Sequence, residues 1–348
     1  MSIRLPVTSL GASLRRPRVC QACKRAGPRS RVTSISTRTY ASSSSSSSSS
    51  QRSRPTLRFI PLSLFILPPI LWYLSKDGAS STLNPAVYTD HTVKSARKVS
   101  EQHKEVVISL SPGSAETFAG GSALITPEKL QAAGKGEGKA VTVYHVMVKS
   151  PDLMIERPYT PVNDVKAEGE VKLVVKRVRG GEVGRVVHSL KPGDPVGLRG
   201  PIPTFSIDPS SYDRVIMVSS GTGIAPFLQL LSTLPASQPA DGPKFTLIHA
   251  TPPADRVDWV SDPSLIPALQ SKHGDQLAVH RYPPNSLPVD ELARAVKASG
   301  ERVMVLVCLP PAMMRPICGP LTVTLQQGEL TGHLRDLGLR SDQVIKLE

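Results

Sequence analysis

RVIMVSSGTGIAPFLQLL, residues 214–231, places an apolar strand directly before a glycine-rich turn and an apolar helix. Val215–Val218 is apolar without interruption, which favours a strand buried on both faces of a sheet. The backbone N–H groups of a glycine-rich turn at the start of a helix can face a phosphate. The stretch therefore predicts a strand–turn–helix unit of an α/β domain, with a ligand phosphate at its turn.

The residues that follow this stretch repeat the alternation of strands and helices. The sequence predicts a helix at Ala225–Leu234, strands at Phe245–Ala250, Leu277–Tyr282 and Val303–Cys308, and a second helix at Val289–Ser299. Strands that alternate with helices imply a parallel sheet with crossover connections. Cys308-Leu309-Pro310-Pro311 follows the last buried strand, at the carboxyl edge where open α/β sheets hold their ligands.

The residues that precede this stretch indicate an antiparallel β-barrel. Val141–Lys149 and Val171–Val178 alternate apolar and polar residues as half-buried strands do, while Gly113–Lys139 indicates a loop insertion. Pro192-Gly193-Asp194 predicts a turn, and Gly200-Pro201 predicts a strand end. RPYTP, residues 157–161, lies at a strand end and offers an arginine for a phosphate, a tyrosine for a conjugated ring and a hydroxyl for a ring nitrogen.

The positive charge of the chain belongs to its N-terminal fifth. Residues 1–76 hold 13 Lys or Arg and no Asp or Glu, whereas the rest holds 29 basic and 28 acidic residues. This balance argues against a nucleic-acid groove on the folded body. The Arg- and Ser-rich leader is typical of a mitochondrial transit peptide. The alternative is a basic disordered tail that carries no targeting signal.

A single transmembrane anchor is expected at residues 57–75. Phe59–Ser75 is a run of 17 uncharged residues, about 25 Å long as a helix, and Pro61, Pro68 and Pro69 make it imperfect. A secretory signal is disfavoured because the run begins far from Met1. If the anchor follows a matrix-directed leader, the protein is in the mitochondrial inner membrane and its body faces the intermembrane space.

The length of 348 residues leaves room for about two domains and an appendage. The expected organisation is a leader at 1–56, the anchor at 57–75, a linker at 76–87, a barrel domain at 88–208 and an α/β domain at 209–348. No metal site is expected, because Cys20 and Cys23 have no second pair and no HExxH spacing occurs. His249 and His280, on predicted strands, are interpreted as structural.

From about Tyr88 to Glu348 the chain resembles the ferredoxin-reductase and cytochrome b5 reductase group of flavoproteins. The matching segments are RPYTP, GEVKLVVK, LKPGDPVGLRGP, VSSGTGIAPFLQLL and VCLPPAMM. The resemblance implies an FAD-binding barrel, a nicotinamide-binding α/β domain, and transfer of electrons from NADH or NADPH through FAD to a haem protein such as a cytochrome. The leader, the anchor and GHLRDLG at 332–338 resemble a fungal mitochondrial flavoprotein that assists haem attachment to cytochrome c.

The resemblance also implies roles for individual residues, all of them in cofactor binding and none as a catalytic acid or base. Arg157 binds the FAD phosphates, Tyr159 packs on the isoalloxazine, and Thr160, followed by Pro161, hydrogen-bonds the ring. Val175 and Lys176 border the flavin. The turn at which nucleotide phosphates meet the flavin domain is shaped by Gly221, Thr222, Gly223 and Pro226, and Cys308 approaches the nicotinamide.

Three positions depart from the family pattern. Gly184 replaces a serine that contacts the FAD phosphates, Val178 replaces an aromatic residue, and Leu309 replaces a glycine beside the nicotinamide. The loss of one charged hydrogen bond, about 1 to 3 kcal/mol, weakens FAD binding without abolishing it. Leu309 favours an alternative, an FAD-binding scaffold or haem-protein partner that has lost nicotinamide use. A non-redox anchored interaction protein is the remaining alternative, which RPYTP and SSGTGIAP disfavour.

The leader and anchor lead to a first prediction. Residues 1 to about 50 should be absent from the mature protein, and the protein should resist carbonate extraction of mitochondria, because an apolar run of this length holds it in the bilayer. Protease should reach the body once the outer membrane is ruptured. Release by carbonate would remove the anchor, and protection from protease would reverse the topology.

Overall fold

The computed structural model describes residues 82–119, 140–150, 154–236, 242–250, 258–283, 286, 288–298, 300 and 302–347. The expected leader and anchor lie outside the described residues. Within the described part, no helix is long and apolar enough to cross a membrane. Two sheets, both within one compact unit, organise these residues. The domain boundaries at 88, 208 and 348 stay predictions.

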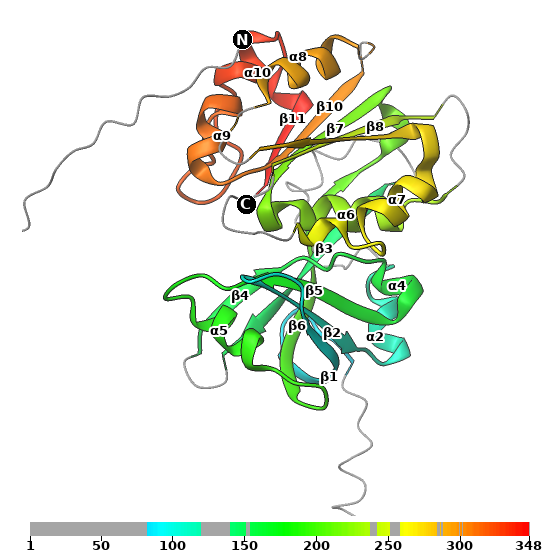
Figure 1. The fold of residues 1–348 in the computed structure, drawn as a ribbon, viewed down its shortest axis with the longest axis vertical. Coiled ribbons are helices and arrows are strands. Elements are labelled where there is room, and N and C mark those ends of the chain that lie inside the picture. The colour runs from blue at the N-terminus through cyan, green and yellow to red at the C-terminus, as the bar shows by residue number, and fades with distance from the viewer. Residues whose placement is uncertain are drawn as a thin grey trace, which may run out of the picture. The chain divides into compact units, whose positions relative to one another are not determined.

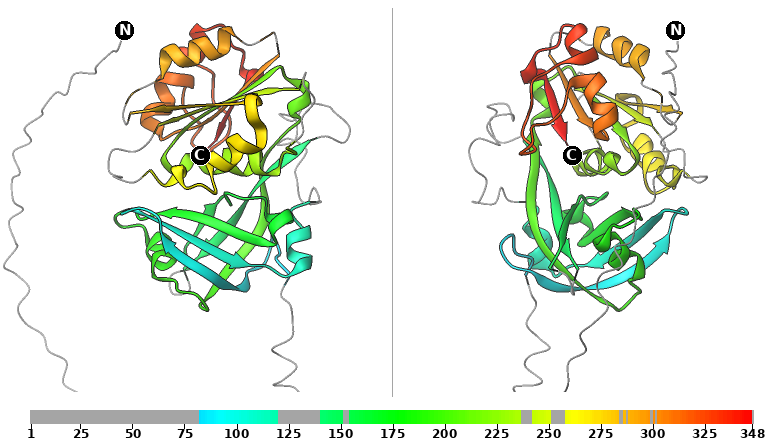
Figure 2. Two further views of the ribbon diagram at one scale, coloured as in Figure 1. Left: turned by 45° about the vertical axis from the view of Figure 1, so that its right-hand side comes forward. Right: turned by 90° about the vertical axis from the view of Figure 1, so that its left-hand side faces the viewer.

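The first sheet is antiparallel and six-stranded, in the order β4-β3-β6-β1-β2-β5. Figure 2 shows these strands, cyan to green, curling around their own interior. The end strands β4 and β5 are not neighbours among the described residues, so the expected barrel is an open half-barrel. Its elements are β1 (Thr89–Lys98), β2 (His103–Ser109), α2 (Pro112–Glu116), β3 (Val141–Lys149), β4 (Glu156–Tyr159), α4 (Val165–Glu168), β5 (Glu170–Lys176), α5 (Glu182–Ser189) and β6 (Pro195–Ile207).

Two expectations for this sheet were wrong. Gly200-Pro201 does not end a strand, because β6 continues through it to Ile207. The β3–β6 ladder shifts register beside it, and the N–H of Gly200 donates to the carbonyl of Asn84 at 3.0 Å, so the irregularity is absorbed inside the strand. The start of the expected loop Gly113–Lys139 is instead the short helix α2, and residues 120–139 lie outside the described part.

The second sheet has five parallel strands in the order β11-β10-β7-β8-β9. Every residue of β10 is buried, which explains the uninterrupted apolar run VMVLVC. The parallel sheet expected from the sequence is therefore confirmed. Its main elements are β7 (Arg214–Ser220), α6 (Ala225–Thr233), β8 (Lys244–Ala250), α7 (Ile266–His273), β9 (Leu277–Tyr282), α8 (Val289–Lys297), β10 (Val303–Cys308), α9 (Pro311–Cys318), α10 (Gly332–Asp336) and β11 (Val344–Leu347).

Helices cover both faces of the parallel sheet (Figure 1). On one face, α6 and α7 pack over one set of alternate strand residues, including Val215 and Met217. On the other face, α8, α9 and α10 pack over the intervening set, including Ile216 and Val218. The first apolar cluster also contains Val143 of β3, so the two sheets share a core.

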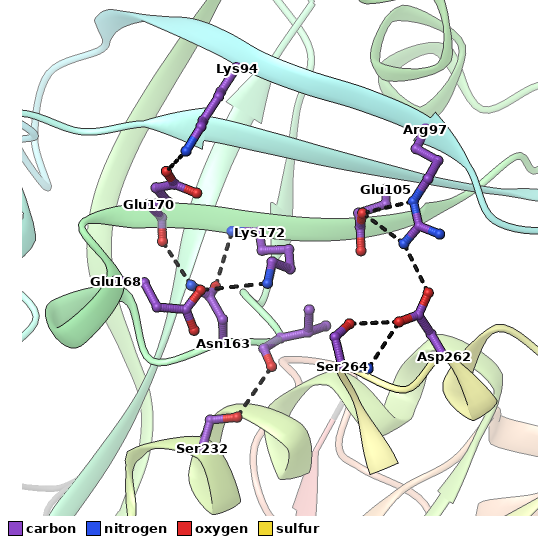
Figure 3. A network of polar contacts seen from close by, with 11 residues as sticks. Lys94, Arg97, Glu105, Asn163, Glu168, Glu170, Lys172, Ser232, Asp262 and Ser264 are labelled. Atoms are coloured by element: carbon purple, nitrogen blue, oxygen red, sulfur yellow. Dashed lines mark hydrogen bonds and ion pairs between the residues drawn. The ribbon is translucent and has the colours of Figure 1, made fainter. Parts of the chain in front are cut away.

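Polar contacts join the two sheets at the edge of this shared core (Figure 3). Arg97 of β1 donates to Glu105 of β2 and, at 3.0 Å, to Asp262 beyond β8. The hydroxyl of Ser232 on α6 donates to the carbonyl of Val162 at 3.5 Å. The ion pair is largely exposed at its arginine, so it contributes little to stability.

A buried polar pair links β7 and β8 near their carboxyl ends. The Oγ of Ser219 and the Nδ1 of His249 lie 2.9 Å apart, and each residue is 1% exposed. Burial is the main reason that the pKa of His249 is lowered to about 4; the charge of Asp258 acts to raise this pKa and that of Arg281 to lower it. The imidazole is thus neutral in the folded protein, which agrees with its interpretation as a structural histidine.

His249 makes stability dependent on pH. Its pKa is about 4 when folded and about 6.5 when unfolded, so the unfolded state binds more protons between these values. The free energy of unfolding should therefore fall as pH falls below about 6.5, by about 2 kcal/mol between pH 7 and pH 5. Urea unfolding of wild type and of the double variant Ser219→Ala/His249→Phe measures it. Equal pH dependence in both proteins would contradict the assignment.

Candidate functional site

RPYTP begins on β4, which pairs with β3 so that Arg157 faces Val148 and Tyr159 faces Val146. The preceding Glu156 anchors this strand. Its carboxylate accepts from Arg199 of β6 at 3.0 and 3.2 Å and also from the hydroxyl of Tyr88. The bond from Tyr88 and the charge of Arg199 lower the pKa of Glu156, which therefore stays ionised at neutral pH.

The side chains of RPYTP are presented to different surroundings. Arg157 is exposed, and its Nη1 donates to the carbonyl of Glu156 at 2.7 Å; a guanidinium carries five N–H donors, so others can bind a ligand. Tyr159 is half-buried against the core of the half-barrel, and burial raises its pKa. Pro161 is buried and Thr160 half-buried, so the motif runs from solvent into the protein.

Val175 and Lys176, at the end of β5, are placed differently from each other. The Val175 side chain is 1% exposed in the core, and its carbonyl accepts from the Nε2 of His188 at 2.8 Å. Lys176 is half-buried. Val175 can therefore border a flavin through its backbone only, whereas Lys176 offers a side chain.

The start of α5 suits a diphosphate. Its N-cap Gly181 provides no side-chain cap, and the first N–H groups of a helix lack partners within the helix. Gly184 lies in this first turn, where a Cβ would meet the Lys176 carbonyl oxygen at 3.4 Å, an ordinary contact. Glu182 is the residue that opposes an anion there, but Arg185 pairs with its carboxylate at 3.1 Å. The residues present therefore fit the phosphates of FAD.

The glycine-rich turn (Gly221–Ile224) lies between β7 and α6. Gly221 has a φ of +57°, which favours glycine. A Cβ on Gly223 would lie 2.6 Å from the carbonyl oxygen of Cys308, so only glycine lets the turn approach the end of β10 this closely. Pro226 is buried in the first turn of α6, where its missing N–H costs no helical bond. The four residues expected at this turn therefore lie together.

A pocket of about 410 Å³ opens beside this turn. Leu309 is 6% exposed and has two roles, since it packs into the apolar cluster under α9 and also contributes to the pocket wall. Three of the residues predicted from the sequence to bind a cofactor line this pocket, namely Thr222, Gly223 and Cys308. The remaining walls come from Ser220, Pro310, Pro311, Met314, Arg315, Pro320, Leu321, Thr322 and Leu325.

The last four of these residues lie on a loop after α9 that the sequence analysis did not find. Lys346 of β11, 3% exposed, connects the two ends of this loop by hydrogen bonds. Its Nζ donates to the carbonyls of Pro320, Gly328 and Glu329 at 3.2, 3.0 and 2.8 Å. Burial lowers the pKa of this ammonium group. A lysine inside the otherwise apolar VIKL is the sequence signal that could have indicated such a contact.

Comparisons with known proteins agree with this geometry. Residues 127–207 match the model of the oxidoreductase FAD-binding domain. The chain is 33% identical over 201 residues to NADH-cytochrome b5 reductase 2 of Candida albicans, with 55% of this chain and 65% of that protein covered. The chain thus spans slightly less than two thirds of this relative.

A second relative is covered more fully. The chain is 30% identical over 230 residues to NADH-cytochrome b5 reductase 2 of Kluyveromyces lactis, with 63% of this chain and 76% of that protein covered. Among solved structures, the cytochrome b5 reductase domain of Ulva prolifera nitrate reductase has a TM-score of 0.53 at 20% identity, covering 76% of this chain and 99% of that one. This similarity confirms the arrangement of a half-barrel and a parallel sheet.

Proposed function

The chain belongs to the NADH-cytochrome b5 reductase family, and from this premise we propose that it is an FAD-dependent oxidoreductase that takes electrons from NADH and passes them to a haem protein. Membership of the family confirms the resemblance found in the sequence. The relatives are NADH-cytochrome b5 reductases, which supports NADH rather than NADPH as the electron donor.

One observation carries the proposal. A flavin motif and a glycine-rich nucleotide turn occur in one compact unit, and a pocket of about 410 Å³ lies beside the turn. Gly223 and Cys308 pack so closely there that the turn and the end of β10 form one wall. A binding module for a single cofactor would have no use for both features.

When bound, FAD would supply the electron chemistry, because a flavin can exchange electrons either in pairs or singly. Arg157 and the start of α5 would hold the diphosphate, and the Glu156–Arg199 pair keeps the strand that carries Arg157 in place. Tyr159 offers its ring to the isoalloxazine. The turn at Gly221 orients the nucleotide phosphates through backbone N–H groups. No side chain in the described site is required to move a proton.

A scaffold that binds FAD without using NADH is the second candidate, and Leu309 favours it. This side chain is part of the pocket wall, where a glycine would leave more room. Its burial in the cluster under α9 holds it in place, so it cannot simply swing into solvent. The two candidates make opposite predictions for reduction of the flavin by NADH.

The acceptor and location extend the same proposal. The relatives' names support cytochrome b5 as the type of acceptor. The leader and the apolar run support a body anchored in the mitochondrial inner membrane and facing the intermembrane space. In that compartment, assistance of haem attachment to cytochrome c is the alternative role for the same electrons, supported by the resemblance of the leader, the anchor and residues 332–338.

FAD retention tests the flavin site. Wild type should copurify with FAD, and Arg157→Ala should lose most of it, because a charge-assisted phosphate contact is removed. A loss of about 1.5 to 3 kcal/mol corresponds to roughly tenfold to a hundredfold weaker binding. Arg340→Ala, which removes another exposed arginine, is the matched control. A colourless wild type that takes up no added FAD would contradict the site.

Stopped-flow reduction by NADH tests the role of Leu309. Hydride transfer needs reacting atoms about 3 to 3.5 Å apart, so a crowded pocket slows it. We expect sluggish reduction of wild type and at least about tenfold faster reduction of Leu309→Gly, equivalent to about 1.4 kcal/mol of barrier.

Leu330→Ala is the control for Leu309→Gly, since Leu330 packs in the same cluster but does not line the pocket. It should lose stability without any gain in rate. Fast reduction of wild type, unchanged by Leu309→Gly, would mean that Leu309 does not obstruct the nucleotide. Failure of NADH to reduce either protein would favour the scaffold.

A further inference from the structure

Gln229 of α6 is 3% exposed and binds the backbone of the other sheet through its whole amide group. Its Oε1 accepts from the N–H of Tyr144 at 2.6 Å. Its Nε2 donates to the carbonyl of Tyr144 at 3.1 Å and to the carbonyl of Pro161 at 3.3 Å. One side chain thus occupies both backbone groups of a residue in β3 and also reaches the segment after β4.

The place of this contact in β3 explains why an amide is needed. The β3–β6 ladder shifts register between Val143 and Tyr144, and Tyr144 lies opposite Pro203, which has no N–H to donate. A glutamine amide carries both donors and an acceptor, as a peptide group does. Gln229 therefore acts as a local strand partner for Tyr144, at the point where the regular ladder is interrupted.

The two ends of this contact belong to the two halves of the proposed site. Pro161 is the last residue of RPYTP, the flavin motif. Gln229 lies four residues after Ala225, where α6 begins, which is about 6 Å along the helix axis. The turn that contains Gly223 and contacts Cys308 directly precedes that helix. A short, rigid path therefore runs from the flavin motif to the nucleotide turn.

We infer that Gln229 is a positioning residue, which fixes the distance between the nucleotide turn and the flavin motif and so sets the rate of hydride transfer. The inference rests on the proposed function. Other contacts between the sheets are less suited to this role. Ser232 reaches the Val162 carbonyl at only 3.5 Å, and the Arg97–Asp262 pair is solvent-exposed at its arginine and screened by salt.

A first measurement needs no flavin. Gln229→Met keeps the length of the side chain but cannot donate, and it leaves the Tyr144 backbone without its amide partner. In the FAD-free full-length protein, the Tyr144 amide should exchange its hydrogen at least about tenfold faster than in wild type. Ser232→Ala removes the weaker contact from the same helix, and its Tyr144 amide should exchange as in wild type.

The second measurement is anaerobic flavin reduction at increasing NADH concentration. Gln229→Met should lower the limiting rate by roughly a hundredfold, since a displacement of about 1 Å has an effect of that size. The apparent Kd for NADH and the FAD content should change less than about threefold, because the residues that contact the two ligands are intact. Ser232→Ala should stay within about twofold of wild type.

NADH deuterated at the reacting C4 position distinguishes poor alignment from a general loss of structure. In Gln229→Met the isotope effect on the limiting rate should be at least as large as in wild type, because hydride transfer itself is the step that slows. A rate that falls while the isotope effect disappears would overturn the inference. An unchanged limiting rate in folded, FAD-loaded Gln229→Met would also overturn it.

Gln229→Asn covers the case in which Gln229→Met does not fold or loses FAD. It keeps the amide but is one methylene shorter, so it should also lower the limiting rate, and a wild-type rate would overturn the inference. If neither variant folds, Gln229 is a structural residue and the inference fails. A wild-type protein that NADH does not reduce removes the proposed function as well, whereas fast wild type with equally fast Gln229→Met removes the inference alone.

Discussion

The buried amide of Gln229 joins two sheets that share no strand. The half-barrel and the parallel sheet are each hydrogen-bonded within themselves, and a shared apolar cluster packs them together without fixing a direction. Directional bonds are what set one geometry among many similar packings, and the buried ones described here come from Gln229, on the helix that follows the nucleotide turn. The proposed electron path depends on this geometry, since the two halves of the site are on different sheets.

The sequence predicted the elements whose apolar residues follow a regular pattern. β10, buried along its whole length, and β3, which alternates, were predicted at their observed bounds because their apolar patterns match their surroundings. The glycine-rich turn was also predicted, because its residue types are restricted locally. Gly221 has a positive φ, and Gly223 lies too close to the Cys308 carbonyl to carry a side chain.

Two elements that were not predicted, α9 and β11, contain residues that are unusual in a helix or in a buried strand. α9 begins at Pro311 and contains Pro316, so its composition indicates a loop. β11 has a lysine among apolar residues, and only the tertiary structure supplies the three carbonyls that accept from Lys346. Gln229 lay inside a quoted motif, but its partners are about 70 and 85 residues away, beyond the reach of any local pattern. Contacts of that kind depend on the fold itself.

The departures from the family pattern fall on both sides of the site. Gly184 lacks the side chain that a serine would place at the start of α5, whereas Leu309 adds a side chain beside the pocket. A missing hydroxyl weakens the binding of a cofactor, and an added side chain alters the approach of a substrate, so the two changes act on different steps. The fold is preserved in both cases, because neither position belongs to the contacts between the sheets.

The proposed electron path can be followed in the visible spectrum of the full-length protein, recorded before and after anaerobic addition of NADH. We expect flavin absorption bands in the purified protein and their bleaching by NADH, since both halves of the site are held together. Flavin bands that dithionite bleaches and NADH leaves unchanged would contradict it, as would a protein without flavin that binds none when FAD is supplied.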